Sequence, residues 1–467
     1  MVSINTLKFR KAYIDIENYL FSNNYRIIVL LGMRKSGKTT ILRQLAAHNN
    51  GHYIDFRNEK DGAAAYSAAL QGEKDLLLFD EIGHLAAFDV YMEMLESEAG
   101  CCDKSIVITS SSYTAMRQLV TEKLGGGRAK AVALHPLGFE EYLYFSGRIS
   151  EYGADYIPTA ADVEDFYRLK GVPAGMDFVL DRDFLIGTFS DELTVLENMQ
   201  YAQRGIFLNE TQYTSVLDIL SYTLNRQFRL NVFNDARVGV QEYGGAVAHS
   251  LDLSTALITY SNEVTKKMTS VEIATVVAAL YMKGFLFLDL VTGNFDKPSP
   301  ERAVTDLLAV KTDSDLRAVL TRYIFSFISP LLYTRLMVDI EDIVGKFVAN
   351  PSLYGRLYEL TIKTESVCRH GFRLFPCSYF YKHDITGKEI DLYDHPLLLE
   401  ATVETKTNEN GHLAFIVDSV LERQPLIRVL TDVPDVNMKM SNYWRLGYPL
   451  ALLKLSNGTI FDLDPSP

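Results

Sequence analysis

The sequence predicts an α/β protein whose amino-terminal part is a three-layer domain built around a parallel sheet. The first observation is that short apolar runs of strand length alternate with segments of helical pattern over residues 27–134. The second is a glycine-bounded loop that joins the first apolar run to the next helical segment. The third is another apolar run, which ends in the adjacent acids Asp80 and Glu81. Together they predict a ligand site at the carboxyl edge of the sheet.

The elements of this domain follow from the same patterns. Residues 4–22 have the apolar spacing of an amphipathic helix. Helical segments separate most of the expected strands, which is typical of a parallel sheet covered on both faces. Five strands are expected, at Ile27–Leu31, Tyr53–Arg57, Leu76–Phe79, Ser105–Thr109 and Ala129–Leu134.

The loop after the first strand matches the phosphate-loop (Walker A) pattern G-x-x-x-x-G-K-[ST] at every specified position. Gly32 and Gly37 allow backbone conformations that a side chain would block, so successive N–H groups can face phosphate oxygens. Lys38 is expected to reach the β- and γ-phosphates, and the Thr39 hydroxyl to hold Mg²⁺. The residues expected to bind the nucleotide are Gly32, Met33, Arg34, Lys35, Ser36, Gly37, Lys38, Thr39 and Thr40.

The two acids that follow Leu76–Phe79 have the composition of a Walker B motif. Adjacent acids suit a buried strand only where they emerge at its carboxyl end. Asp80 is expected to share the Mg²⁺ ion with Thr39, and Glu81 to polarise the attacking water as a general base. The alternative is a strand that ends in solvated acids, but the phosphate loop upstream favours hydrolysis.

Two further positions are candidates for the same site. Thr109 and Ser110 end the fourth strand, where phosphate-loop ATPases with an additional central strand carry a polar residue that senses the γ-phosphate. Arg128 follows three glycines and could stabilise transition-state charge in its own subunit or a neighbour's. The alternatives are an ordinary polar strand end and a surface arginine beside a hinge.

Beyond this core, the pattern changes several times. A helix at 270–280 that leads into a strand suggests a winged-helix-like arrangement, yet it carries almost no basic residues and favours packing over reading a DNA groove. The expected segments are a phosphate-loop core at 1–145, a helical lid at 146–204, a winged-helix-like region at 205–300, a helical connector at 301–349 and a closing α/β domain at 350–467.

The closing domain carries an acid on a helix and acids on two following strands, Glu359, Asp391 and Glu400. This is the layout of restriction-endonuclease-type metal sites, which add a lysine two residues after the last acid. That position is Thr402 here, and the pair Glu404 and Lys406 would need a register shift of four residues. We therefore expect a restriction-endonuclease-like fold without nuclease activity; the alternative is ordinary α/β packing with exposed acids.

The composition limits the partners, the cysteine chemistry and the cellular compartment that we expect for this protein. The 46 basic and 59 acidic residues give a net charge of -13, which disfavours a surface dedicated to wrapping nucleic acid but leaves room for a local basic patch. The four cysteines fit neither a disulfide framework nor a zinc site, so free thiols are expected. The absence of a signal-peptide core or a membrane-length apolar run predicts a cytoplasmic protein that does not enter a membrane.

The order of these pieces resembles a bacterial and archaeal family of AAA-superfamily ATPases, in which an AAA module precedes a domain with winged-helix-like and restriction-nuclease-like parts. Besides the two nucleotide motifs, the resemblance is carried by Gly127-Arg128 with Pro136-Leu137-Gly138-Phe139-Glu140-Glu141-Tyr142-Leu143, and by Gly171-Val172-Pro173. In the closing part it is carried by Gly355-Arg356-Leu357-Tyr358-Glu359, Glu389-Ile390-Asp391, Leu398-Leu399-Glu400 and Gly447-Tyr448-Pro449-Leu450. The family's usual Glu-[Val/Ile]-Lys is Glu400-Ala401-Thr402 here.

The resulting expectation is an ATP-binding protein that hydrolyses ATP with Mg²⁺ and uses it to drive or gate a conformational change. One alternative is a nucleotide-operated switch that binds a protein or DNA partner with little turnover. Another is an ATP-gated nuclease. The partner is not identified by the sequence, and a homo-oligomer is compatible with it.

Overall fold

The computed structural model describes the chain in segments separated by gaps. By its internal contacts the chain divides into two compact units, and each is described by itself. The first comprises residues 1–136, 178–214 and 282–284; the second comprises the remainder. The described residues are 8–22, 25–96, 103–120, 124, 129–173, 195, 198, 251–259, 261–292, 299–331, 342–349, 351–373, 376–382, 389–394, 397–402, 426–430, 435–439 and 444–463.

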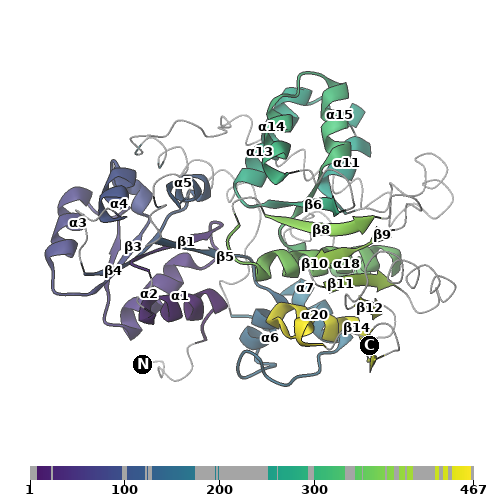
Figure 1. The fold of residues 1–467 in the computed structure, drawn as a ribbon, viewed down its shortest axis with the longest axis horizontal. Helices are drawn as coiled ribbons and strands as arrows, with labels where there is room; N and C mark the ends of the chain where they lie inside the picture. The colour runs from purple at the N-terminus through teal and green to yellow at the C-terminus, as the bar shows by residue number, and fades with distance from the viewer. Residues whose placement is uncertain are drawn as a thin grey trace. The chain divides into compact units, whose positions relative to one another are not determined.

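The sheet of the first unit has five parallel strands in the order β2-β3-β4-β1-β5, of which β3, β4, β1 and β5 are labelled in Figure 1. All five strands lie where the sequence predicts them, within three residues. The central position of β4 puts it between the strand before the phosphate loop and the strand with the acids. The strands are β1 (Ile27–Gly32), β2 (His52–Asp55), β3 (Leu76–Asp80), β4 (Ser105–Thr109) and β5 (Ala129–Leu134).

Helices cover both faces of this sheet, which confirms the three-layer α/β prediction (Figure 1). Buried side chains of α1 and α2, such as Ile16 and Leu42, pack on one face, against Leu30 and Leu78. On the other face Phe79 contacts Tyr66 of α3, which in turn contacts Tyr91 of α4. The helical elements are α1 (Lys11–Phe21), α2 (Lys38–His48), α3 (Gly62–Gln71), η2 (Ile82–His84), α4 (Phe88–Glu96) and α5 (Tyr113–Gln118).

The second unit contains two sheets. One has the order β7-β6-β8-β9, and the other has the order β10-β11-β12-β14-β13 with a parallel centre. The strands are β6 (Leu286–Thr292), β7 (Ile324–Phe327), β8 (Cys377–Lys382), β9 (Glu389–Ile390), β10 (Leu392–Asp394), β11 (Leu397–Thr402), β12 (Leu426–Leu430), β13 (Asn437–Lys439) and β14 (Trp444–Gly447). The helices are α6 (Phe139–Ser146), α7 (Ala160–Arg168), α11 (Leu253–Thr259), α12 (Ser261–Val264), α13 (Ser270–Met282), α14 (Pro300–Leu308), α15 (Asp313–Arg322), α17 (Ile343–Val348), α18 (Pro351–Arg369), α20 (Tyr448–Asn457) and η6 (Thr459–Asp462).

The strand that follows α13 joins distant parts of the sequence. β6 pairs antiparallel with β7 and parallel with β8, so it belongs to a sheet shared with the closing segment. The segment expected as a helical connector contains β7 between its helices. Most of the winged-helix-like region lies outside the described residues, so that assignment and the five-segment division stay predictions.

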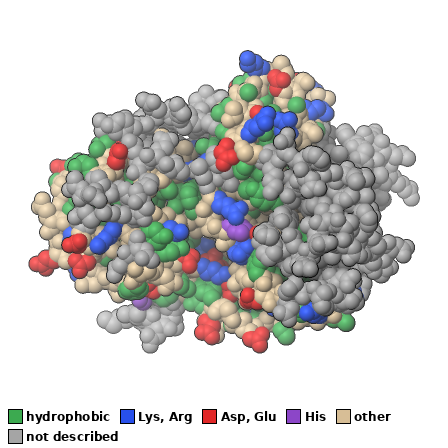
Figure 2. Space-filling model, in the orientation of Figure 1, with side chains coloured by type: hydrophobic (Ala, Val, Ile, Leu, Met, Phe, Trp, Pro, Cys, Tyr) green, Lys and Arg blue, Asp and Glu red, His purple; other side chains and the backbone are tan. Residues whose placement is uncertain are grey.

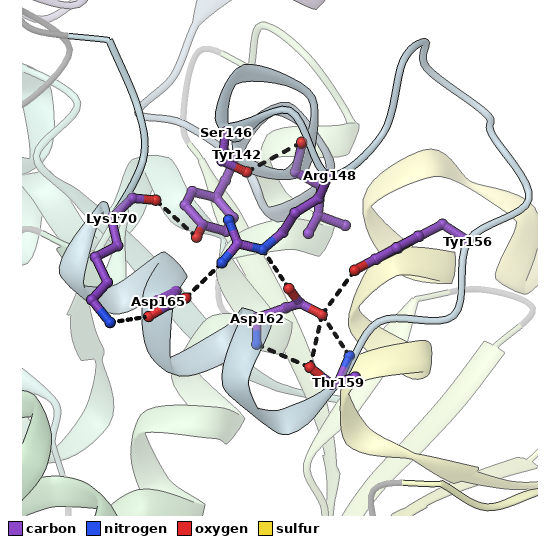
Figure 3. Close-up of polar contacts among 9 residues, drawn as sticks. Tyr142, Ser146, Arg148, Tyr156, Thr159, Asp162, Asp165 and Lys170 are labelled. Carbon is purple, nitrogen blue, oxygen red and sulfur yellow. Dashed lines mark hydrogen bonds and ion pairs between the residues drawn. The ribbon is translucent and has the colours of Figure 1, made fainter.

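A polar network fastens α6 to α7 (Figure 3). Arg148 donates hydrogen bonds to Asp162 and Asp165, and its guanidinium lies 5.4 Å from the ring centroid of Tyr142. Burial would raise the pKa of Asp162, but hydrogen bonds from Thr159 and Arg148 hold this pKa below its usual value. Asp162 is therefore an anion that belongs to the cap of α7 and also pairs with Arg148, just beyond the end of α6.

The surface of the first unit carries acidic and basic side chains interspersed on the face seen in Figure 2. Cys368 and Cys377 are free thiols, as expected. Among the residues that the structure describes, none of the helices combines the length and the apolar character needed to cross a bilayer.

Candidate nucleotide-binding site

The phosphate loop joins β1 to α2 with the backbone that its glycines allow. Gly37, the residue before α2, has φ 103°, which favours glycine. Lys35 also has a positive φ of 60°. A Cβ on Gly32 would lie 2.8 Å from the backbone oxygen of Leu134, so the start of the loop has no room for a side chain. No side chain caps the amino end of α2, and its first N–H groups remain available to an anion.

Lys38 is buried at the first turn of α2. Its Nζ donates hydrogen bonds to the carbonyl oxygens of Gly32 (2.9 Å) and Met33 (3.0 Å), so the ammonium folds back over the loop. Burial lowers the pKa of Lys38, and the nearby charges of Glu81 and Asp80 oppose this effect. The sequence placed this lysine and the two acids in one site, and the structure brings them close enough to interact.

Asp80 ends β3 and is completely buried. Its Oδ2 accepts a hydrogen bond of 2.8 Å from the hydroxyl of Tyr53. Its Oδ1 is buried and has no hydrogen-bond partner among the residues that the structure describes. A buried carboxylate oxygen without a donor costs free energy, so its position suits a cation ligand.

Glu81 follows at φ 52° and ψ 44°, a left-handed conformation that is uncommon for a residue with a side chain. This backbone turn directs its carboxylate toward the end of β4, where Oε2 accepts a hydrogen bond of 2.6 Å from the N–H of Ser111. The two acids, although adjacent in sequence, therefore have different partners.

The site's residues fit a nucleoside triphosphate and its metal ion. Within the described part of the chain, the Oγ atoms of Ser36 and Ser111 are buried without hydrogen-bond partners, as is Asp80 Oδ1. Hydroxyl groups and a carboxylate oxygen are ligands that phosphate and Mg²⁺ respectively prefer. Thr39 is half-buried beside Lys38, whereas Thr40 is exposed.

Of the remaining residues predicted for this site, the structure describes Thr109 and Ser110 but not Arg128. The Thr109 hydroxyl donates a 3.0 Å hydrogen bond to the carbonyl of Leu30, and Ser110 Oγ accepts one from the N–H of Ser112. Both lie at the carboxyl end of β4, and the sensor role stays a prediction. Arg128 lies outside the described residues, so its role stays a prediction as well.

Sequence reasoning gave no role to several residues at this site. Arg10 is buried and donates to the carbonyls of Ser36 and His135, which braces the phosphate loop from the amino-terminal segment. Tyr53 and Arg57 lie on β2 and at its end, and the pKa of Arg57 is raised by its hydrogen bond to Asp55 and by the charges of Glu81 and Asp80. The alternation of Tyr53 and Asp55 was the available signal for Tyr53, because alternate residues of a strand share a face.

The acids of the closing domain form a second charged group. The N–H of Asp391 donates to Glu400 Oε2 at 3.3 Å, and Asp391 Oδ2 accepts from the N–H of Ala401 at 2.8 Å. Glu359 is instead paired with Lys363 and Arg356 on its own helix. Over the described residues, no cluster of three His, Cys, Asp or Glu side chains could hold a metal ion.

Part of the chain matches a known family of domains. Residues 24–143 match the family model of an AAA domain, a range that contains both nucleotide motifs. The match covers the part of the chain that holds all five strands of the first sheet. No curated protein matches the sequence.

Several solved structures are similar to the chain at low identity. A Walker-type ATPase of Pyrococcus abyssi has 14% identity over 71% of this chain and 97% of its own, with a TM-score of 0.35. The ORC2 protein of Aeropyrum pernix, solved as ADPNP–ADP complexes, has 12% identity over 72% and 93%, with a TM-score of 0.33. A RuvB variant of Thermotoga maritima has 15% identity over 64% and 94%, with a TM-score of 0.25.

Proposed function

We propose that the chain binds ATP with Mg²⁺ and hydrolyses it at the carboxyl edge of the first sheet. The observation that supports this most strongly is that three charged side chains come together. Lys38 is buried, Asp80 is buried with one oxygen that has no partner among the described residues, and Glu81 follows β3 and bonds to the end of β4. The AAA-type family match over residues 24–143 is consistent with it.

In this proposal Lys38 and the N–H groups of the loop bind the phosphates, and Thr39 and Asp80 hold the metal ion. The ion would neutralise charge that builds up on the phosphate oxygens during transfer. Glu81 orients the attacking water and accepts its proton once its carboxylate leaves the N–H of Ser111. Positioning and charge stabilisation then supply most of the rate enhancement.

The test is phosphate release and nucleotide binding by wild type, Glu81→Gln and Lys38→Ala, with and without DNA. Glu81→Gln should bind ATP within a few-fold of wild type and lose about 10²–10³ in turnover, because the amide cannot accept a proton. Lys38→Ala should lose binding. The exposed Glu73→Gln is the matched control and should behave as wild type. Equal turnover in wild type and Glu81→Gln would remove the role given to Glu81.

A nucleotide-operated switch is the second candidate, and one observation favours it. The carboxylate that would activate water is held by the backbone N–H of Ser111 at 2.6 Å, an arrangement that suits nucleotide retention with slow turnover. Tight binding with turnover unaffected by Glu81→Gln would support the switch over the hydrolase.

A further inference from the structure

The hydrogen bond between Tyr53 and Asp80 selects one carboxylate oxygen. The Tyr53 hydroxyl donates to Oδ2 at 2.8 Å, while Oδ1 has no hydrogen-bond partner among the described residues. Asp80 is completely buried, so water does not compete for Oδ2. The carboxylate therefore has one oxygen fixed by a neighbouring strand and one oxygen left to bind something else.

The register of the sheet explains why Tyr53 can reach this oxygen. Asp55 pairs with Asp80 across the parallel strands β2 and β3, so the two residues share a face of the sheet. Tyr53, two residues earlier on the same strand, lies on that face as well. The Tyr53 hydroxyl, at the far end of the side chain, reaches along the strand direction to the carboxylate of Asp80.

The Tyr53 ring is itself held from the helix that follows the phosphate loop. The guanidinium carbon of Arg43, on α2, lies 5.4 Å from the ring centroid. This cation–π contact links α2, which carries Lys38 and Thr39, to the strand that carries Asp80. Burial and the bond to Asp80 raise the pKa of Tyr53 to about 12, so the hydroxyl remains a donor at physiological pH.

We propose that Tyr53 is a positioning residue for the metal ion: its hydroxyl holds Asp80 in the orientation that presents Oδ1 to the divalent cation of the nucleotide complex. This inference rests on the proposed function and adds a residue from β2 to it. Hydrogen-bond partners of metal ligands orient those ligands, and losing such a partner commonly weakens metal affinity by about 10–100-fold.

The test uses Tyr53→Phe in the full chain, which removes the hydroxyl and keeps the ring over which Arg43 lies. Mn²⁺ affinity is measured by electron paramagnetic resonance with a saturating non-hydrolysable ATP analogue. Analogue affinity is measured separately in EDTA. Tyr53→Phe should weaken Mn²⁺ binding about 10-fold or more and leave metal-free analogue binding within about twofold. Tyr19→Phe, whose ring packs on Tyr25 in the same unit, should match wild type in both.

A double variant shows whether Tyr53 acts through Asp80. Tyr53→Phe added to Asp80→Asn should not weaken Mn²⁺ binding beyond Asp80→Asn alone. In the double variant the carboxylate that the Tyr53 hydroxyl would orient is already absent. Unchanged Mn²⁺ affinity in Tyr53→Phe would overturn the inference. Equal losses of Mn²⁺ and metal-free analogue affinity would also overturn it, since they indicate a general structural role. A wild type that binds no analogue would instead refute the proposed function itself.

Discussion

At the scale of single residues, the buried Lys363 of the second unit has acidic partners. The Nζ of Lys363, on α18, lies 2.5 Å from Asp289 Oδ2 and 2.8 Å from Glu359 Oε1. Burial alone would lower the pKa of Lys363, but Asp289 and Glu359 raise it above its ordinary value. Together with Asp391 these side chains line a cavity of about 210 Å³. The ammonium thus pairs with Glu359, one of the acids that the sequence suggested as metal ligands, and with Asp289, which it did not suggest.

Lys363→Met should destabilise the second unit by about 3–5 kcal/mol, because it leaves the buried carboxylate of Asp289 without its cation and leaves Glu359 paired with Arg356 alone. Urea unfolding followed by circular dichroism measures the loss. Adding Asp289→Asn should recover part of it by removing the uncompensated charge. Lys170→Met is the matched control: Lys170 pairs with Asp165 but is 67% exposed, so it should change stability by less than about 1 kcal/mol. Similar effects of the two lysine variants would contradict this account.

At the scale of secondary-structure elements, the amino end of α7 is fixed by a capping box. The Thr159 hydroxyl accepts a hydrogen bond from the N–H of Asp162, and Asp162 accepts one of 2.8 Å from the N–H of Thr159 (Figure 3). The same carboxylate pairs with Arg148 beyond α6. The cap therefore sets both where α7 begins and how it packs on α6.

Thr159→Ala should cost about 1 kcal/mol of stability, because an N–H at the first turn of α7 loses its acceptor and Asp162 loses a donor. Thermal unfolding by calorimetry or circular dichroism checks this. Thr321→Ala removes an exposed hydroxyl that bonds within α15, and it should change stability by only a few tenths of a kcal/mol. The interpretation fails if the two threonine variants lose the same amount.

At the scale of the whole molecule, the sequence was most informative where structure is local. The strands that precede the two nucleotide motifs, β1 and β3, are apolar runs, and both motifs lie at strand ends, so their convergence could be predicted. The hydrogen bond from Tyr53 to Asp80 could not, because it depends on strand register. The contact of Arg10 with His135 joins residues 125 positions apart. The pairing of β6 with β8 could not be predicted either, because it joins strands that are far apart in the sequence and no local pattern indicates it.

The two units give a way to separate hydrolysis from switching. Hydrogen exchange is measured by mass spectrometry on the full chain, with and without Mg²⁺ and a non-hydrolysable ATP analogue. Binding stabilises the states that bind, by about 2.7 kcal/mol at a ligand concentration of 100 times Kd. We therefore expect slower exchange in peptides of β1, α2 and β3, and no such effect in Lys38→Ala. For an ATPase whose nucleotide acts locally, peptides of β11 and β12 should be unchanged.

A switch makes the opposite prediction for the second unit. A ligand shifts a distant part of a protein only if it binds one of two global states more tightly, so exchange in β11 and β12 would then change as well. This change of exchange in β11 and β12 would have to disappear in Lys38→Ala, because that variant loses nucleotide binding at the phosphate loop and leaves the second unit intact. Protection absent from β1, α2 and β3 in wild type would contradict both mechanisms, because each requires the nucleotide to be held by those elements.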